Sequence, residues 1–419
     1  MTEVGLIMFD KKNRNVLFVS FDFPPSNRVA VQRSLAFAYH MIEKGWNVRV
    51  LTVKASCYDS IDNDLFFPQD LKERVDRTWA FNTQKFGVGG KYIDFLTIPD
   101  EWVSWYLSAY IKGRSIVKQH NIGLIWSTCP PFTPHLIAGR LSQAYGIPWI
   151  ADYRDPVERG KHGQGVIGQT WGINRTDDFV VRQASKVVFT TDEARKSYLE
   201  THDKKFHSKF EVIPNGYYDL PGLDREDFGT DEMKEGPLEV LYSGNIYGDR
   251  NPRIIIEALA GLIKEKRISK HDIKLVFQGG SVREVVDPLV SEFGLKDSVE
   301  CRGAVGFEES LRAMHKANAL LLVQGAKFNI HVPAKAYEYI AARKPIFAVC
   351  DSNGSTATLM RKIDNAAVIT SLYSAKEALL KLINGEYKVT GANETIAYSR
   401  YSGAEKLNRL AGLYCKEID

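Results

Sequence analysis

Short apolar runs alternate with amphipathic stretches along most of the chain. Residues 15–21, NVLFVSF, form a β-rich run that ends in a cluster of turn residues. In residues 28–44 the apolar positions recur at spacings of three and four, which predicts an amphipathic helix closed by Gly45. Residues 47–53 form the next apolar run. This strand, helix and strand predict a βαβ unit, the opening of a doubly wound parallel sheet.

The same alternation continues through the first half of the chain. It predicts strands at residues 122–127, 148–153, 186–191 and 210–213, and helices at 101–119, 132–145 and 177–184. Residues 54–100 give no clear assignment. The expected helix at 101–119 carries an aromatic and aliphatic stripe made of Trp102, Trp105, Tyr106, Ala109 and Ile116. Such a stripe is typical of a core face, and a membrane-facing or lipid-acceptor surface is the alternative.

The second half repeats this pattern. It predicts strands at residues 239–243, 273–278, 299–305, 319–323 and 346–349, and helices at 252–265, 334–343 and 401–414. A chain of 419 residues is too long for one hydrophobic core, so we expect two domains. We assign residues 1–216 to the first domain and residues 217–400 to the second. Residues 401–419 are expected to form a helix that crosses back to the first domain.

Composition narrows the class of protein. Fifty-five Lys and Arg against 51 Asp and Glu give a net charge of +4, which is mild compared with the basic face of a nucleic-acid binder. Five scattered cysteines without a CxxC pair favour reduced thiols in a cytosol and no metal knuckle. We find neither a signal peptide pattern nor an apolar run of 18 residues. These features predict a cytoplasmic protein, and the charge also allows a peripheral position at the inner membrane face.

The stretch HVPAKAYEYIAARKPIFAVC, residues 331–350, holds the strongest candidate chemistry. Pro333 suits the first turn of a helix, and Glu338 lies within two turns of that helix's N-terminus. A helix N-terminus that feeds a parallel sheet is an anion site, and an acid on its face can bind ligand hydroxyls. The alternative is an ordinary amphipathic helix whose Lys335 and Glu338 are solvated.

This stretch resembles the donor-site signature of GT-B glycosyltransferases, in particular glycosyltransferase family 4. The match is closest to members with Pro-x-Lys before the acid, through Pro333, Lys335 and Glu338. The resemblance implies that Glu338 binds the ribose of a nucleotide-sugar. Many members carry another Glu eight residues earlier, where this chain has Ile330.

The resemblance extends to the turn after residues 239–243. It implies that Gly244 approaches the donor diphosphate. Family members place an Arg directly after that glycine and a Lys about six residues on, whereas this chain has Asn245 and Arg250. Lys335 would supply the missing cation. Further donor-side positions by resemblance are Gly279, Ala304 and Val305.

The segment ADYRDP, residues 151–156, resembles a family branch that acts on cell-envelope polysaccharides. The resemblance implies that Arg154 offers its guanidinium to sugar hydroxyls or phosphate while Asp155 orients it or the acceptor. A buried structural ion pair is the alternative. Family members often carry glycines in the loop at residues 22–28, where this chain has Asn27 and Arg28. We therefore expect an acceptor-side contact from Arg28 or from Arg33.

Two glycine-rich stretches do not fit nucleotide-binding motifs. Residues 163–168 have the spacing GxGxxG but follow a polar stretch rather than a strand, so we read them as a mobile loop over the cleft. Residues 87–91, GVGGK, have the wrong spacing for a phosphate loop, and Tyr92 stands where Ser or Thr is needed.

The predicted fold class is α/β, with two doubly wound Rossmann-like domains facing one another across a cleft, as in GT-B enzymes. The resemblance implies transfer of a sugar from a nucleotide-diphosphate-sugar donor to a hydroxyl of a glycan or lipid-linked glycan acceptor in bacterial surface polysaccharide synthesis. It also implies retention at the anomeric carbon, with neither metal nor other cofactor. Arg154, Asp155, Arg250 and Lys335 are the expected catalytic residues. A nucleotide-sugar epimerase of the same fold and a non-catalytic sugar-nucleotide-binding subunit remain alternatives.

Overall fold

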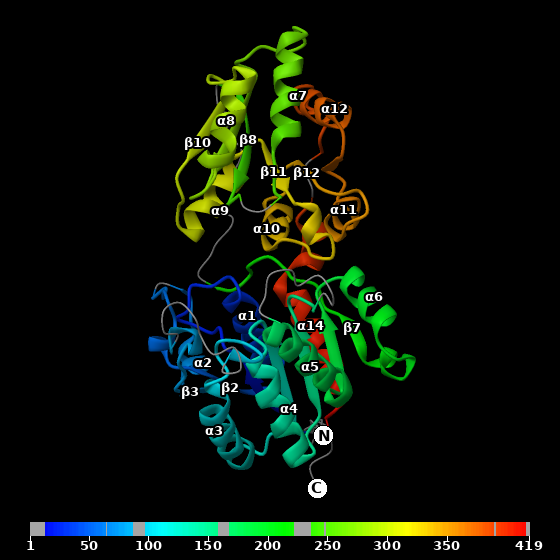
Figure 1. Cartoon of the computed structure of the whole chain (residues 1–419). Helices are drawn as coiled ribbons and strands as arrows, with labels where there is room; N and C mark the ends of the chain where they lie inside the picture. The colour runs from blue at the N-terminus through cyan, green and yellow to red at the C-terminus, as the bar shows by residue number, and fades with distance from the viewer. Residues whose placement is uncertain are drawn as a thin grey trace, which may run out of the picture. The chain divides into compact units, whose positions relative to one another are not determined.

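The computed structural model describes residues 13–63, 65–86, 97–157, 167–221, 236–246, 249–388 and 391–415. The chain divides into two compact units (Figure 1). Unit 1 comprises residues 1–190, 197–213 and 404–419, and unit 2 comprises residues 191–196 and 214–403. The glycine-rich residues 87–91 lie outside the described residues, as do Gly163 and Gly165 of the other stretch.

Unit 1 is built on a seven-stranded parallel sheet in the order β3-β2-β1-β4-β5-β6-β7. Its strands are β1 (Asn15–Val19), β2 (Asn47–Val53), β3 (Val75–Thr78), β4 (Leu124–Cys129), β5 (Trp149–Tyr153), β6 (Lys186–Phe189) and β7 (Phe210–Val212). In the register, Val16 of β1 lies between Val48 of β2 and Leu124 of β4. The interior strands are mostly apolar because helices cover both faces of a parallel sheet, and the buried polar exceptions include Asp152 of β5.

The helices of unit 1 include four long ones that follow the strands. They are α1 (Val31–Glu43), α3 (Trp105–Gln119), α4 (Thr133–Tyr145) and α5 (Ile167–Gln183), with the shorter α2 (Gln69–Lys72) and with α6 (Asp192–Thr201), which the unit boundary divides. Helix α4 packs between α3 and α5. The C-terminal α14 (Arg400–Gly412) joins unit 1 from residue 404 onward. There Trp46 Nε1 donates to Asn408 Oδ1 at 2.8 Å, and Lys44 pairs with Glu405.

Unit 2 contains a six-stranded parallel sheet in the order β10-β9-β8-β11-β12-β13. Its strands are β8 (Leu238–Ser243), β9 (Ile273–Gln278), β10 (Val299–Arg302), β11 (Ala319–Val323), β12 (Ile346–Val349) and β13 (Ala366–Ile369). Alternate residues face opposite cores: Val240 and Tyr242 belong to one cluster of buried side chains, and Leu241 to the other. The two sheets share one arrangement: β1 lies between β2 and β4 in unit 1, and β8 lies between β9 and β11 in unit 2.

Two groups of helices complete the two cores of unit 2. On one face lie α7 (Arg253–Lys264), α8 (Arg283–Phe293) and α12 (Leu372–Ile383); on the other lie α9 (Phe307–Lys316), α10 (Ala334–Ala342) and α11 (Ser355–Met360). The short α13 spans Ala392–Thr395. Within the described residues, no helix combines the length and the hydrophobicity that a bilayer crossing requires.

The predicted pair of doubly wound α/β domains is confirmed, and β2, β9, β11 and β12 have the predicted bounds. The edge strands β3 and β13 were not predicted. The sequence of β3, VDRT, has no apolar run, and each of the two strands pairs with one neighbour only. Helix α5 begins at Ile167 rather than at residue 177, and β10 ends at Arg302 rather than at residue 305.

The aromatic stripe expected on a helix at residues 101–119 lies in the core, as the first of its two readings predicted, although α3 itself begins at Trp105. Trp102, Trp105, Ala109 and Ile116 are buried, and Tyr106 is partly exposed. The five cysteines are free thiols.

Candidate functional site

The ends of β8 and β9 meet in a tight pair of turns in unit 2. Gly244 directly follows β8, has a φ of +120°, and donates its N–H to the carbonyl of Gln278 at 2.8 Å. Such a φ is disfavoured for residues with a side chain. A Cβ at Gly279 would overlap the Gly244 carbonyl, so both glycines are needed for this close backbone approach.

Asn245 braces the same turn. Its Oδ1 accepts the N–H of Gly280 at 2.9 Å, and its carbonyl accepts the hydroxyl of Tyr242 at 2.9 Å. Asn245, at the position where the resembled family has an arginine, therefore stabilises the backbone of this turn. No positive charge enters the site at this position.

Lys335, in the first turn of α10, brings an ammonium group to this turn. Its Nζ lies 3.7 Å from the centre of the Tyr242 ring and 3.2 Å from the position that a Cβ atom on Gly244 would occupy. The nitrogen is buried, although the residue as a whole is partly exposed, and in the described part of the chain it has no hydrogen-bond partner. Burial lowers the pKa of Lys335 well below its ordinary value, and the nearby Arg250 lowers the pKa further.

Arg250 supplies the second cation. The residue is buried, and its guanidinium carbon lies 5.4 Å from the centre of the Phe328 ring. Its charge acts on Lys335 strongly enough to lower that pKa. Lys335, in the first turn of α10, therefore brings a positive charge to the turn after β8, and Arg250 adds a second charge near Lys335; this arrangement suits an anionic ligand.

Tyr339 also positions this turn and was missed by the sequence analysis. Its hydroxyl accepts the N–H of Ser243 at 2.9 Å, so α10 is fixed against the end of β8. Tyr339 lies one helical turn after Lys335, on the same face of α10. This spacing of four was the available signal in the sequence.

Glu338 is buried in unit 2. Its Oε1 accepts the N–H of Tyr218 at 2.8 Å and lies 3.9 Å from Nη2 of Arg400. Glu338 therefore links the segment at Tyr218 to the segment at Arg400, and both segments lie within a few residues of the unit boundaries. The same two segments are also joined where Tyr217 donates its N–H to the carbonyl of Tyr398 at 3.0 Å. The alternative reading of Lys335 and Glu338 as solvated side chains is wrong, because the ammonium nitrogen and the carboxylate are both buried.

The remaining donor-side positions lie around these groups in unit 2. Pro333 is the N-cap of α10, with φ of −65° and ψ of 142°. Ala304 and Val305 lie in the loop between β10 and α9, where Ala304 is exposed. The carbonyl of Ile330, at the position of the absent glutamate, accepts the hydroxyl of Thr191 at 2.6 Å.

In unit 1, Arg33 forms a buried ion pair. Its Nε and Nη2 lie 3.0 and 2.6 Å from the two carboxylate oxygens of Asp152, and Nη2 also donates to the carbonyl of Ile213 at 2.9 Å. Thr128 donates to the same carboxylate at 3.0 Å. With 4% of Arg33 exposed, these bonds give it a structural role, and the expected acceptor contact has no support in this geometry.

Arg154 and Asp155 do not form a buried ion pair, which was the alternative reading of this segment, because Asp155 is exposed. Arg154 donates from Nε to the Cys129 carbonyl at 3.2 Å, and its Nη2 lies 3.8 Å from Oδ2 of Asp22. Burial raises the pKa of Asp22, which the charges of Arg154 and Arg28 partly oppose. Asp22, in the turn after β1, is a further candidate site residue of unit 1 that the sequence did not indicate.

The two other acceptor-side candidates lie in the loop after β1. Asn27 accepts the hydroxyl of Ser60 at 2.6 Å. Arg28 pairs with Asp59 at 3.2 Å and lies 3.8 Å from Oδ1 of Asp22. Side chains of residues 58–60 thus hold this loop in place. Among the residues that the structure describes, no group of three His, Cys, Asp or Glu side chains is arranged to hold a metal ion.

Comparison with known proteins gives a family match within unit 2. Residues 224–391 match the family model described as Glycosyl transferases group 1. A search of the curated proteins gives no match to the chain. The matched residues include Gly244, Arg250, Lys335 and Glu338.

Solved structures resemble nearly the whole chain. The sucrose-phosphate synthase of Thermosynechococcus elongatus is 16% identical with a TM-score of 0.64, and the match covers 96% of this chain and 98% of that one. HepE of Anabaena, in complex with UDP, is 12% identical with a TM-score of 0.62, over 95% and 100% of the chains. The lipopolysaccharide outer core galactosyltransferase WaaB is 12% identical with a TM-score of 0.62, over 95% and 99%. At these identities the likeness establishes the fold, which is that of GT-B glycosyltransferases.

Proposed function

We propose that the protein is a glycosyltransferase that transfers a sugar from a nucleoside-diphosphate-sugar to a hydroxyl of a glycan or lipid-linked glycan acceptor. The observation that carries the proposal is the buried ammonium of Lys335 beside the Gly244 turn, within the segment that matches the group 1 family. An unneutralised buried cation is costly unless an anion binds to it. The diphosphate of a nucleotide-sugar is an anion that would neutralise this cation.

The chemistry proposed for unit 2 is electrostatic. As the bond between the sugar and the diphosphate breaks, negative charge grows on the leaving phosphate. Lys335, Arg250 and the N-terminus of α10 stabilise that charge, and this stabilisation requires no metal ion. Glu338 is proposed to bind the ribose hydroxyls, and the loop at Ala304 and Val305 to contact the base.

The chemistry proposed for unit 1 concerns the transferred sugar and the acceptor. The exposed carboxylate of Asp155 and the guanidinium of Arg154 offer an acceptor and donors to sugar hydroxyls. Retention at the anomeric carbon and a place in the family 4 branch of surface polysaccharide synthesis are part of the same proposal, and they rest on the sequence motifs PxKxxE and RDP.

Nucleotide binding by the full chain tests the donor part of the proposal. We would measure the melting temperature with UDP, GDP, dTDP, CDP and NAD, beginning with UDP because the HepE structure contains it. At about 100 times its dissociation constant a ligand stabilises the folded state by about 2.7 kcal/mol. Each kcal/mol corresponds to roughly 2–4 °C for a domain of this size. One nucleoside diphosphate should raise the melting temperature and NAD should not; a response to NAD alone would contradict the proposal.

Labelled nucleotide-sugar then separates transfer from the alternatives. Incubation with acceptor should move the label to the acceptor and release the nucleoside diphosphate. An epimerase would convert the donor sugar without any acceptor, and a non-catalytic subunit would bind the donor and leave it unchanged.

A further inference from the structure

Helix α3 of unit 1 has a second face, opposite the buried aromatic stripe. Leu107 and Ile111 lie one helical turn apart on it and are 65% and 62% exposed. Arg114 and Lys118 continue this stripe and are also exposed. An exposed row that combines aliphatic and basic side chains offers both kinds of contact that an anionic membrane surface can make.

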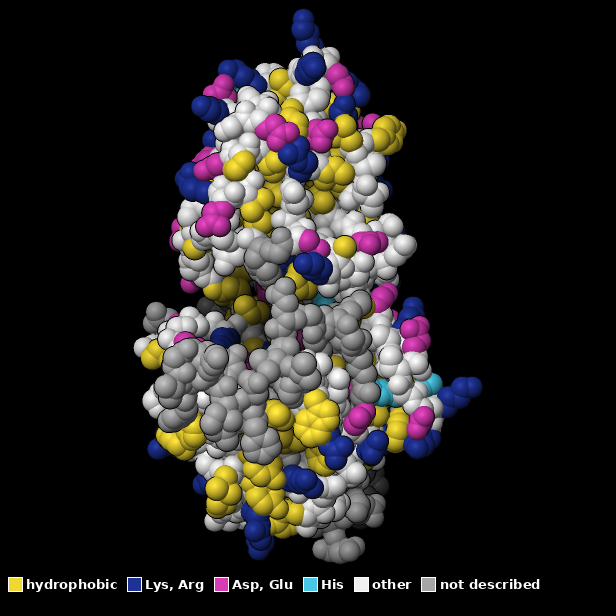
Figure 2. Space-filling model, in the orientation of Figure 1, with side chains coloured by type: hydrophobic (Ala, Val, Ile, Leu, Met, Phe, Trp, Pro, Cys, Tyr) yellow, Lys and Arg dark blue, Asp and Glu magenta, His cyan; other side chains and the backbone are white. Residues whose placement is uncertain are grey.

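The neighbouring helices carry the same mixture. Trp171 of α5 is 58% exposed, which is unusual for so large an aromatic side chain. Among the described residues of α3, α4 and α5, the exposed side chains include five Arg or Lys and no Asp or Glu; the basic ones are Arg114, Lys118, Arg140, Arg175 and Arg182. Figure 2 shows hydrophobic and basic side chains gathered over these helices.

The basic side chains are held beside aromatic rings. The guanidinium of Arg175 lies 5.5 Å from the Trp171 ring centre, that of Arg140 lies 5.3 Å from Phe179, and that of Arg114 lies 6.0 Å from Tyr110. Tyr110 in turn stacks on Tyr106 at 5.9 Å. These contacts hold the guanidinium groups at the surface next to apolar side chains, so that charge and hydrophobic area are presented together.

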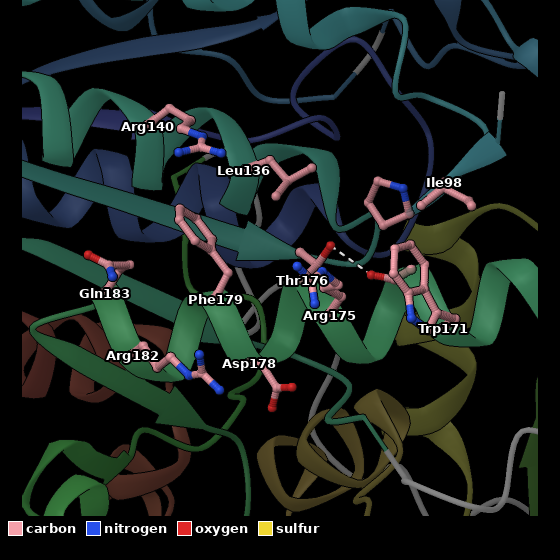
Figure 3. Close-up of a pocket in the computed structure, with 12 residues that line it drawn as sticks. Ile98, Leu136, Arg140, Trp171, Arg175, Thr176, Asp178, Phe179, Arg182 and Gln183 are labelled. Carbon is pink, nitrogen blue, oxygen red and sulfur yellow. Dashed lines mark hydrogen bonds between the residues drawn. The ribbon is translucent and has the colours of Figure 1, made fainter. Parts of the chain in front are cut away.

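A pocket of about 480 Å³ opens between α4 and α5 at this face (Figure 3). Arg140, Arg175 and Arg182 line it, together with one acid, Asp178. Leu136 and Phe179 supply apolar walls, and Trp171 stands at the end near Ile98. Three guanidinium groups around a partly apolar pocket suit a phosphate that is attached to a hydrocarbon chain.

We propose that this basic face, made of Leu107, Ile111 and Trp171 with Arg114, Arg140 and Arg175, docks onto an anionic lipid bilayer and holds a lipid phosphate in the pocket between α4 and α5. The excess of positive charge complements an anionic bilayer, and it disfavours the pairing of this face with a second copy of itself. The exposed Trp and aliphatic side chains would enter the headgroup region. The inference does not depend on the donor site, because every residue in it belongs to unit 1.

The test is co-sedimentation of the full chain with vesicles of phosphatidylcholine alone or mixed with phosphatidylglycerol. The wild-type protein should bind the anionic vesicles, release them in high salt, and ignore the neutral ones. Each basic residue near such a surface contributes roughly fivefold, so Arg114→Gln, Arg140→Gln and Arg175→Gln together should weaken binding about a hundredfold. Equal binding to both vesicle types, or binding to neither, would overturn the proposal.

A matched control removes the same charge elsewhere. Lys270, Arg283 and Arg312 are exposed in unit 2, and their replacement by Gln should leave vesicle binding close to the wild type. An equal loss in this control would mean general electrostatic attraction without a docking face.

For the apolar side chains, Leu107→Ser with Ile111→Ser and Trp171→Ser should weaken binding by about tenfold or more. The control there is Tyr373→Ser with Ile396→Ser and Leu413→Ser, at exposed positions outside α3, α4 and α5.

Two further readouts exclude simpler explanations. Lipids brominated in the acyl chains should quench tryptophan emission of the wild type more than that of Trp171→Phe, and equal quenching would contradict insertion of Trp171. Binding of inorganic phosphate that is lost with Arg140→Gln and Arg175→Gln, with no vesicle binding, would assign the pocket to a soluble anion and overturn the membrane proposal. The melting shift with UDP should be unchanged in all face variants, so that failure of docking is distinguished from failure of donor binding.

Discussion

The two sheets have the same strand order apart from the additional β7 of unit 1, yet the buried charges packed beside them are arranged differently. In unit 1 the buried guanidinium of Arg33 is matched by the carboxylate of Asp152. In unit 2 the buried ammonium of Lys335 has no hydrogen-bond partner among the described residues, and its neighbouring charge is another cation, Arg250. Topology therefore specifies where a ligand site can form, and we propose that the buried ammonium of Lys335 marks unit 2 as the half that binds an anion.

The environment of Lys335 reduces the cost of its burial without removing it. The Tyr242 ring lies 3.7 Å from the ammonium, and a desolvated cation–π contact contributes about 2 kcal/mol. Arg250 acts in the opposite direction, since like charges destabilise one another. Unit 2 thus holds a cation that a bound anion would stabilise.

The largest effect is expected where the charges are already paired. Arg33→Met would leave the Asp152 carboxylate buried without its partner, and the free energy of unfolding should fall by about 3–5 kcal/mol. Urea unfolding measures this loss. The control is Arg28→Met at an exposed arginine, where the change should stay within about 0.5 kcal/mol. Similar losses in the two variants would mean that Arg33 and Asp152 are not a structural pair.

Glu338→Gln tests the proposed ribose contact next. A carboxylate that binds ribose hydroxyls makes charge-assisted hydrogen bonds worth about 1.5–3 kcal/mol, so the dissociation constant for UDP should rise accordingly. Calorimetric titration measures the change, and unchanged affinity would refute the contact. Arg400→Gln is the control, because it disturbs the same buried pair from the other side. It should lower stability while leaving UDP affinity near that of the wild type.

A smaller effect is expected in the pH dependence of donor binding. Burial holds the pKa of Lys335 below its unfolded value, so the stability of the unliganded protein should increase with pH between these two pKa values. A bound diphosphate raises this pKa, so binding should take up as much as one proton and weaken by at most about tenfold per pH unit in that window. Calorimetry in buffers of different ionisation enthalpy detects the uptake. Lys335→Arg, which stays charged, should abolish it; uptake that persists in this variant must come from another group.

Asp155→Asn should have the smallest effect on stability. The side chain is exposed, so the free energy of unfolding should change by no more than about 0.5 kcal/mol. The melting shift with UDP should be retained while sugar transfer falls. Unfolding of this variant would instead support the structural reading of the Arg154 and Asp155 segment.

The regular elements were predictable because the spacing of their apolar residues agrees with the pattern of buried positions. The run at residues 273–278 lies between Asp272 and Gly279 and forms β9 with those bounds. The edge strand β3 was not predictable, since Asp76 and Arg77 lie on its half-buried surface and pair with other side chains. Local pattern does not specify such partners.

The candidate site was predictable only in part, for a related reason. The family resemblance brought attention to Lys335 and Glu338, and helical spacing could have added Tyr339. The pairing of Arg33 with Asp152 spans 119 residues and depends on the way α1 packs on the sheet. The exposed side of α3 was hidden by its buried side, because Trp102 and Trp105 dominate the hydrophobic pattern there.

Lys335→Met, studied with and without UDP, tests the central claim most directly. Methionine keeps a long apolar side chain beside Tyr242 and removes the buried charge. Without ligand, the free energy of unfolding should rise by about 1 kcal/mol or more, since replacing buried charge by a well-packed apolar group is often stabilising. With UDP, the stabilisation of about 2.7 kcal/mol expected for the wild type at 100 times its dissociation constant should be lost. A variant that is less stable than the wild type and still responds fully to UDP would contradict the account, because Lys335 would then be a structural residue.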